Sequence, residues 1–229
     1  MVCGMEIKVI RSVLEENENV AHQVRKHLRG KRQCMINFMS SPGSGKTRLL
    51  ERLIPILQQR GLRVGVIEGD IATTRDAARL QPFDIPIVQI NTEYFGGDCH
   101  LAANVVYGAI KEIEDAPIDV ILLENVGNLV CPAEFDTGSD LNIVLLSVTE
   151  GEDKPLKYPL MFRNAQLALI NKIDLAEAVE ADVALMKKHM LQVNHALQVL
   201  ETSGKSGAGL SALADRIIAK FRDVGGVLS

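Results

Sequence analysis

The segment Ser40–Thr47 reads SSPGSGKT and is the part of the chain whose residue types point most clearly to a chemical role. It follows an apolar stretch, Met35–Met39, and opens a helical pattern. Glycines and small residues at such a junction let backbone N–H groups converge on phosphate oxygens, and the dipole of the following helix adds to the attraction. The predicted phosphate-binding residues are Gly43, Ser44, Gly45, Lys46 and Thr47.

Lys46 is expected to bridge the terminal phosphates, and the Thr47 hydroxyl is expected to ligate Mg²⁺. Ser40 stands where the usual G-x-x-x-x-G-K-[ST] pattern has glycine, so the match is one residue short. The plainer interpretation is a glycine-rich turn with a chance Lys-Thr pair. The apolar stretch before the segment and the helical pattern after it favour the phosphate site.

A second motif, Asn171-Lys172-Ile173-Asp174, follows the apolar stretch Leu167–Ile170 and matches the N-K-x-D signature of guanine-nucleotide proteins. The Asp174 carboxylate can accept bonds from the guanine ring N–H and its exocyclic amino group, which adenine does not present together. Asn171 is expected to tie this loop to the phosphate loop, and the Lys172 stem to cover the base. A backbone N–H in the Ser203-Gly204-Lys205 segment is expected to meet the guanine carbonyl oxygen.

Alone, a four-residue pattern of this kind is weak, because it arises by chance, and Asp174 then only caps the helix that follows. Its position about 125 residues after the phosphate loop, at the end of an apolar stretch, strengthens the prediction of a guanine site.

Acidic residues end two further apolar stretches. Asp70 lies in Glu68-Gly69-Asp70, and Glu124 precedes Asn125-Val126-Gly127. Because nucleotide-bound Mg²⁺ takes oxygen ligands, Asp70 and Glu124 are the candidates for direct or water-mediated contact, alongside Thr47. Gly127 is expected to let the backbone approach the terminal phosphate. Each carboxylate alone is also compatible with a helix cap or an ordinary strand end.

Cys99 and His100 form an adjacent pair of soft ligands, and Cys131 lies 32 residues after Cys99. Thiolate and imidazole suit Ni²⁺ or Zn²⁺ rather than Mg²⁺. Three ligands underfill a tetrahedral site, so a water or a second chain completes it. Since cysteine is also a common core residue, spacing alone leaves this site open. Cys34, by contrast, opens a buried strand and is predicted to be a core residue.

The elements that position these residues alternate between short apolar runs and longer helical patterns. This alternation predicts a doubly wound α/β fold, with a mainly parallel seven-stranded sheet and helices on both faces. Together with the phosphate-loop motif, it indicates a fold of the P-loop NTPase kind. We expect residues 1–30 to form a helical appendage and residues 31–229 a nucleotide-binding domain with an embedded metal site. The predicted strands are Met35–Met39, Val64–Glu68, Ile87–Ile90, Val120–Glu124, Ile143–Val148, Leu167–Asn171 and Ala196–Glu201. The predicted helices are Glu6–Gly30, Lys46–Arg60, Thr74–Leu80, His100–Glu114, Glu177–Gln192 and Leu210–Arg222.

Composition narrows the classes of protein. The 229 residues carry 29 acids and 25 bases, a net charge of −4, which argues against a DNA-coating protein. No apolar run approaches the ~20 residues of a membrane helix, and Met1–Ile10 does not resemble a secretory signal. Four dispersed cysteines do not make a disulfide scaffold. We expect a cytoplasmic protein without a nucleic-acid or membrane partner.

The sequence closely resembles the nickel-insertion GTPases of hydrogenase maturation, the HypB type. The resemblance is carried by Ser40–Thr47, Glu68–Asp70, Cys99–Leu101, Glu124–Pro132 (ENVGNLVCP), Ser147–Pro159 (SVTEGEDKPLKYP) and Asn171–Asp174. It implies a slow GTPase that binds GTP or GDP with Mg²⁺ and dimerises with nucleotide bound. It also implies Cys99, His100 and Cys131 as ligands of Ni²⁺ or Zn²⁺. The implied partners are a small hydrogenase-maturation nickel chaperone and the hydrogenase large subunit.

Three alternatives stay open. Related urease-maturation GTPases share the phosphate loop, but Ala133 stands where they are expected to have histidine after Cys-Pro. A metal-storage module would use the nucleotide only structurally. A P-loop kinase or ligase for a small molecule would need an acceptor pocket and would not need the Asn171–Asp174 motif. Among the catalytic residues we place Lys46, Asp70 and Glu124, and no general base is evident.

Overall fold

A computed structural model describes residues 3–70, 79–92 and 100–228, with the side chains of residues 3–12 and 70 left out. Within these residues, seven parallel strands form one sheet in the order β3-β2-β4-β1-β5-β6-β7. The strands are β1 (Cys34–Ser40), β2 (Val64–Asp70), β3 (Ile87–Asn91), β4 (Val120–Gly127), β5 (Leu141–Ser147), β6 (Leu167–Asn171) and β7 (Gln198–Glu201). The predicted α/β fold is therefore confirmed.

Strand β1 lies between β4 and β5, where the strand order reverses. The chain runs from β1 outward to β2 and β3, returns to β4 beside β1, and then continues on the other side. In open parallel sheets, ligands bind in the crevice at the carboxyl ends of the strands at such a reversal. The loop that follows β1 is the predicted phosphate segment, so the topology places it at the crevice.

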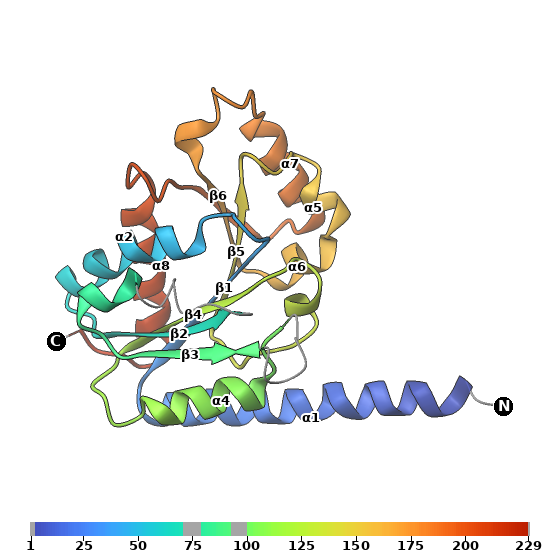
Figure 1. Cartoon of the computed structure of the whole chain (residues 1–229), viewed down its shortest axis with the longest axis vertical. Helices are drawn as coiled ribbons and strands as arrows, with labels where there is room; N and C mark the ends of the chain where they lie inside the picture. The colour runs from blue at the N-terminus through green and yellow to red at the C-terminus, as the bar shows by residue number, and fades with distance from the viewer. Residues whose placement is uncertain (1–2, 71–78, 93–99, 229) are drawn as a thin grey trace.

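Helices cover both faces of the sheet (Figure 1). On one face, α2 (Lys46–Gln59) and α8 (Leu210–Asp223) pack on alternate residues of the central strands, including Ile36, Phe38 and Leu122. On the other face, α1 (Cys3–Gly30) and α4 (Ala103–Glu112) cover β2 and β4. There α6 (Pro159–Asn164) and α7 (Val183–Val193) cover β5 and β6. Strands buried on both faces explain the continuous apolar runs of the sequence.

The predicted elements differ from the observed ones mainly at their ends. Strands β2 and β4 continue through Asp70 and Gly127, so the acidic residues expected after these strands belong to them. Helix α7 begins at Val183 rather than at Glu177, because the Asp182 side chain accepts a bond from the Leu185 N–H and caps it there. The predicted helix Thr74–Leu80 lies mostly outside the described residues.

Short elements escaped the sequence prediction. Helix α5 (Lys154–Lys157) and α6 follow β5, and 3₁₀ turns η1 (Gln81–Phe83), η3 (Cys131–Ala133) and η4 (Ile173–Leu175) lie in loops. Such pieces are too short to show a hydrophobic period. Cys34 is fully buried among the residues of the core, as predicted, and burial raises the pKa of its thiol far above the ordinary value.

Candidate nucleotide and metal site

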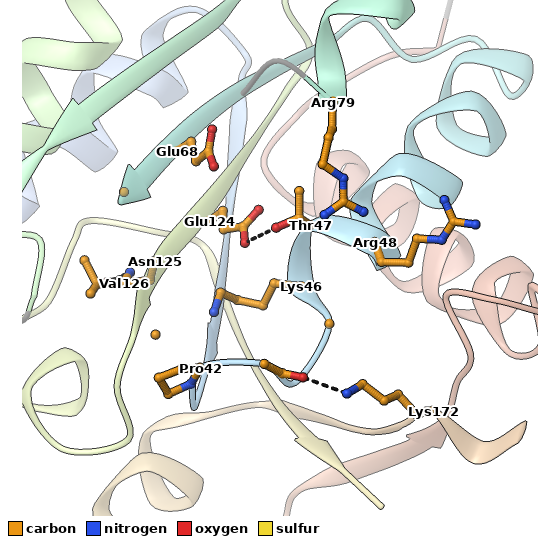
Figure 2. A pocket seen from close by; sticks show the side chains of 14 residues that line it. Pro42, Lys46, Thr47, Arg48, Glu68, Arg79, Glu124, Asn125, Val126 and Lys172 are labelled. Atoms are coloured by element: carbon orange, nitrogen blue, oxygen red, sulfur yellow. Dashed lines mark hydrogen bonds between the residues drawn. The ribbon is translucent and has the colours of Figure 1, made fainter. Parts of the chain in front are cut away.

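A cavity of about 420 Å³ opens at the carboxyl ends of β1, β2 and β4. Figure 2 shows the Lys46 and Thr47 side chains lying along it, at the start of α2. Both side chains are buried, and the Lys46 Nζ donates a hydrogen bond to the Ser40 Oγ at 2.8 Å. A buried ammonium group beside the first turn of a helix is a strong anion site, because charge and helix dipole act together.

Side-chain oxygens that can act as metal ligands lie together at one wall of this cavity. The Thr47 Oγ1 donates to the Glu124 Oε1 at 2.9 Å, and Glu68 lines the same wall (Figure 2). A hydroxyl and carboxylates are the ligands that Mg²⁺ accepts, so this group fits the ion chemically. Asp70 ends β2 nearby in the chain, but its side chain lies outside the described residues.

The phosphate loop is held from the side by Glu150, which lies in the Ser147–Pro159 block but was not predicted as a site residue. Its carboxylate accepts bonds from the hydroxyls of Ser41 and Ser44, the latter at 2.8 Å, and from the Ser147 N–H at 2.9 Å. Glu150 lies three residues beyond the end of β5, the strand beside β1. Its place at the carboxyl end of a neighbouring strand is the signal that could have found it.

We expect Glu150→Ala to lower the free energy of unfolding by about 1–3 kcal/mol, because buried donors lose a charged acceptor. Ser44 is only 1% exposed, so water does not readily replace that bond. Urea unfolding of the ligand-free protein measures the change. Glu177→Ala, at an exposed acid, is the control, and an equal effect of both substitutions would contradict the assigned role.

The Asn171 motif lies against the phosphate loop. The Asn171 Nδ2 donates to the Ser44 carbonyl at 2.9 Å. The Lys172 Nζ donates to the Gly43 carbonyl at 2.7 Å (Figure 2). Gly127, at the end of β4, approaches the same loop so closely that a Cβ there would lie 3.1 Å from the Pro42 Cα. The ends of β4 and β6 therefore both contact the phosphate loop.

A second cavity, of about 300 Å³, lies beside the first and is lined by Gly45, Lys172, Asp174 and Gly204. Asp174 is exposed, and its Oδ1 accepts a bond from the buried Ser203 Oγ. The Ser203 N–H donates to the Ala208 carbonyl at 3.0 Å, so that donor is engaged within its own loop.

Arg79 also lines the first cavity, the one that contains Lys46 and Thr47 (Figure 2). Its Nε donates to the Glu51 Oε1 at 2.7 Å, and Arg48 donates to the other oxygen at 2.8 Å. Burial alone raises the pKa of Glu51, but the bonds from the two arginines outweigh it and hold the pKa below its ordinary value. Glu51 thus stays ionised and fixes the Arg79 guanidinium at the cavity rim, a placement that no sequence motif predicted.

The predicted soft ligands are only partly described. The half-buried His100 ring stacks on Phe135, with centroids 3.7 Å apart and planes at 20°. Phe135 follows Cys131 by four residues, so the His100 and Cys131 segments lie side by side. Cys99 lies outside the described residues. Among the residues described here, no three His, Cys, Asp or Glu side chains cluster tightly enough to hold a metal ion, and Cys131 is disulfide-bonded in this structure.

Comparison with known proteins assigns the family. Residues 34–201, most of the chain, match the CobW/HypB/UreG nucleotide-binding domain. The chain belongs to the CobW/HypB/UreG family. Its similarity to HypB proteins is high: the hydrogenase maturation factor HypB of Rhizobium leguminosarum bv. viciae is 45% identical over 90% of this chain and 68% of the relative. The hydrogenase/urease maturation factor HypB of Helicobacter pylori strain 26695 is 36% identical over 95% of this chain and 89% of the relative.

Solved HypB structures agree with this assignment. The crystal structure of HypB from Helicobacter pylori in complex with nickel superposes with a TM-score of 0.85, at 36% identity over 93% of this chain and 99% of that chain. HypB from Archaeoglobus fulgidus gives a TM-score of 0.83 at 38% identity, over 90% of this chain and 99% of that chain. The chain is therefore a HypB-type P-loop NTPase. In the part of the chain that the structure describes, no helix has the length and apolar character to cross a membrane.

Proposed function

We propose that this chain is a slow, guanine-specific GTPase that carries nickel for insertion into the hydrogenase large subunit. The observation that carries the proposal is the pair of bonds from Asn171 and Lys172 to the phosphate loop. These bonds hold the cavity lined by Asp174 beside the cavity lined by Lys46. A nucleotide can therefore place its base in the first cavity and its phosphates in the second. The HypB relatives, described as hydrogenase maturation factors, support the biological role.

At the phosphate end, we assign the backbone of Gly43, Ser44 and Gly45 to the phosphate oxygens, and Lys46 to the terminal phosphates. Thr47, Glu124 and Asp70 would hold Mg²⁺, directly or through water. The ion, when bound, would neutralise charge that develops on the transferred phosphoryl group.

Hydrolysis on this account depends on positioning and charge. Lys46 stabilises negative charge at the phosphate, and the backbone N–H groups of the loop do the same without reorganising. Gly127 lets the end of β4 approach the terminal phosphate. No side chain is assigned as a general base, and we propose that the reaction is slow. A slow reaction suits a protein in which the nucleotide sets the timing of metal transfer.

At the base end, the Asp174 carboxylate accepts two hydrogen bonds from guanine, and the Lys172 stem covers one face of the ring. Because the Ser203 N–H is engaged with Ala208, Gly204 is the better backbone donor for the guanine carbonyl oxygen. The Ser203 hydroxyl then orients Asp174. An adenine base would leave the covered carboxylate without its partners, which costs about 1–3 kcal/mol.

For the metal cargo we assign Cys99, His100 and Cys131 as ligands, with Cys131 in its reduced, thiolate form. Thiolate and imidazole fit Ni²⁺ and Zn²⁺ equally, and nickel is favoured by the nickel complex of the Helicobacter pylori neighbour. Val130, beside Cys131, is 50% exposed, which suits a site that a second copy covers. We therefore propose a homodimer, formed with nucleotide bound, that completes the metal site.

The remaining partners follow from the same role. A small hydrogenase-maturation nickel chaperone is proposed as the metal donor or acceptor, and the cytoplasm as the place of assembly. A small-molecule kinase is disfavoured, because the chain matches HypB proteins across most of its length and its base cavity carries the Asn171–Asp174 motif.

Competition between GTP and ATP tests the base assignment. Labelled GDP is bound to the chain with Mg²⁺ and then displaced by each nucleotide. We expect GTP to displace GDP at concentrations at least about 100-fold lower than ATP does, equivalent to ~3 kcal/mol. Equal displacement would refute guanine specificity.

A further inference from the structure

Asn17 on α1 joins two segments that are far from it in the sequence. Its Oδ1 accepts a bond from the Ala103 N–H at 2.8 Å, and its Nδ2 donates to the Asp136 carbonyl at 2.8 Å. The side chain is buried, with the residue 8% exposed. Both ends of one amide are therefore used in bonds that water does not readily replace.

The bond to Ala103 caps α4. Ala103 is the first residue of that helix, and Ala102 before it has no side chain that can accept a bond from the exposed N–H groups. Asn17 supplies that acceptor from another helix. In most helices a serine or asparagine at the helix's own N-cap position accepts this bond. The start of α4, three residues after His100, is thereby fixed to α1.

The bond to Asp136 fixes the second segment. Asp136 follows Cys131 by five residues, and its carboxylate also pairs with the Arg25 guanidinium at 2.6 and 2.7 Å. Gly138, with φ of +83°, packs so closely that a Cβ there would lie 2.6 Å from the Val24 Cβ. Asp136 and Gly138, two residues apart in this loop, therefore both contact α1.

The stack of His100 on Phe135 adjoins both attachments, because His100 lies three residues before Ala103 and Phe135 lies directly before Asp136. We infer that Asn17 is a positioning residue for the metal site, which sets the His100 segment at a fixed place relative to the Cys131 segment. The inference rests on the proposed role of His100 and Cys131 as ligands. It also makes α1 the support on which both halves of the site are assembled.

Metal affinity depends on how well the ligands are held before the ion arrives, and removal of a residue that hydrogen-bonds a ligand typically costs 10- to 100-fold. Asn17 holds the backbone of the two segments rather than the ligands themselves, so we expect Asn17→Ala to weaken nickel binding about 10-fold, the lower end of this range. The nickel–thiolate charge-transfer absorption should shift as well, because the thiolate and imidazole meet the ion in an altered geometry. GDP affinity should stay at the wild-type value, since Asn17 lines neither of the two nucleotide cavities.

The experiment uses the full chain, nickel with a competing chelator, and labelled GDP. Asn19→Ala is the matched control, an exposed asparagine on the same helix, and it should change neither affinity. Asn17→Asp keeps the acceptor that caps α4 and removes the donor to Asp136. Asn17→Asp should weaken nickel binding while the cap of α4 stays in place. If Asn17→Ala does not fold, Asn17→Asp is the variant that tests the inference.

Wild-type nickel affinity and absorption in a folded Asn17 variant would overturn the inference. Cys131→Ala separates this result from a failure of the proposed function. If Cys131→Ala binds nickel as tightly as the wild type, the metal site itself is misassigned. If Cys131→Ala loses nickel and the Asn17 variants do not, the site stands and Asn17 does not position it.

Discussion

Asp174→Asn is expected to remove the preference for guanine and to raise the affinity for xanthine nucleotides. The xanthine ring carries a carbonyl where guanine has its amino group, so an amide N–H donates where a carboxylate accepted. We expect the ratio of GTP to XTP affinity to change by about 100-fold or more, because a covered polar group without a partner costs ~3 kcal/mol. Displacement of labelled GDP by GTP, XTP and ATP measures the ratio.

The matched control is Glu177→Gln, an exposed acid three residues further along that the base cavity does not include. It should leave all three affinities at wild-type values. An Asp174→Asn protein that still prefers GTP over XTP as the wild type does would place the base site elsewhere on the molecule.

Lys46→Ala is expected to slow GTP hydrolysis by about 100- to 1000-fold, the range found when one preorganised donor to a developing charge is removed. The Lys46 ammonium is buried beside the start of α2, so solvent cannot substitute for it. Phosphate release at saturating GTP and Mg²⁺ measures the rate, which separates the chemical effect from weaker binding.

Lys188→Ala, at an exposed lysine on α7, is the control and should hydrolyse GTP at the wild-type rate. Thermal unfolding establishes that the Lys46 variant is folded. Hydrolysis by folded Lys46→Ala at a rate close to that of the wild type would mean that the lysine does not contact the reacting phosphate.

The local parts of the fold follow from the sequence. The junction of β1, the phosphate loop and α2 was predicted nearly to the residue, because an apolar strand, a glycine-rich turn and an amphipathic helix each leave a pattern in adjacent residues. The seven strands were predicted in place for the same reason, with errors only at their ends. The expectation that Asn171 binds the phosphate loop is matched by its bond to the Ser44 carbonyl.

Long-range contacts were not predictable in this way. Glu150 contacts Ser44 across 106 residues, and Asn17 contacts Asp136 across 119. Both pairings depend on the strand order, which no periodicity reveals. The sequence pattern predicts residues 1–30 as an appendage packed on the domain or on a partner, and Val24 and Leu28 pack on the domain, in a core cluster with α4 and β4. One apolar stripe on a helix indicates that the helix packs against another surface, but it does not identify that surface.

The nickel affinity of the chain, measured once with GDP and once with a non-hydrolysable GTP analogue, tests most directly whether nucleotide and metal sites are coupled. Gly127 contacts the phosphate loop and lies four residues before Cys131, so we expect a change at the terminal phosphate to move the segment that carries Cys131. We expect affinities that differ by about 5-fold or more between the two nucleotides, the lower end of ordinary coupling energies. Equal affinities would contradict this coupling.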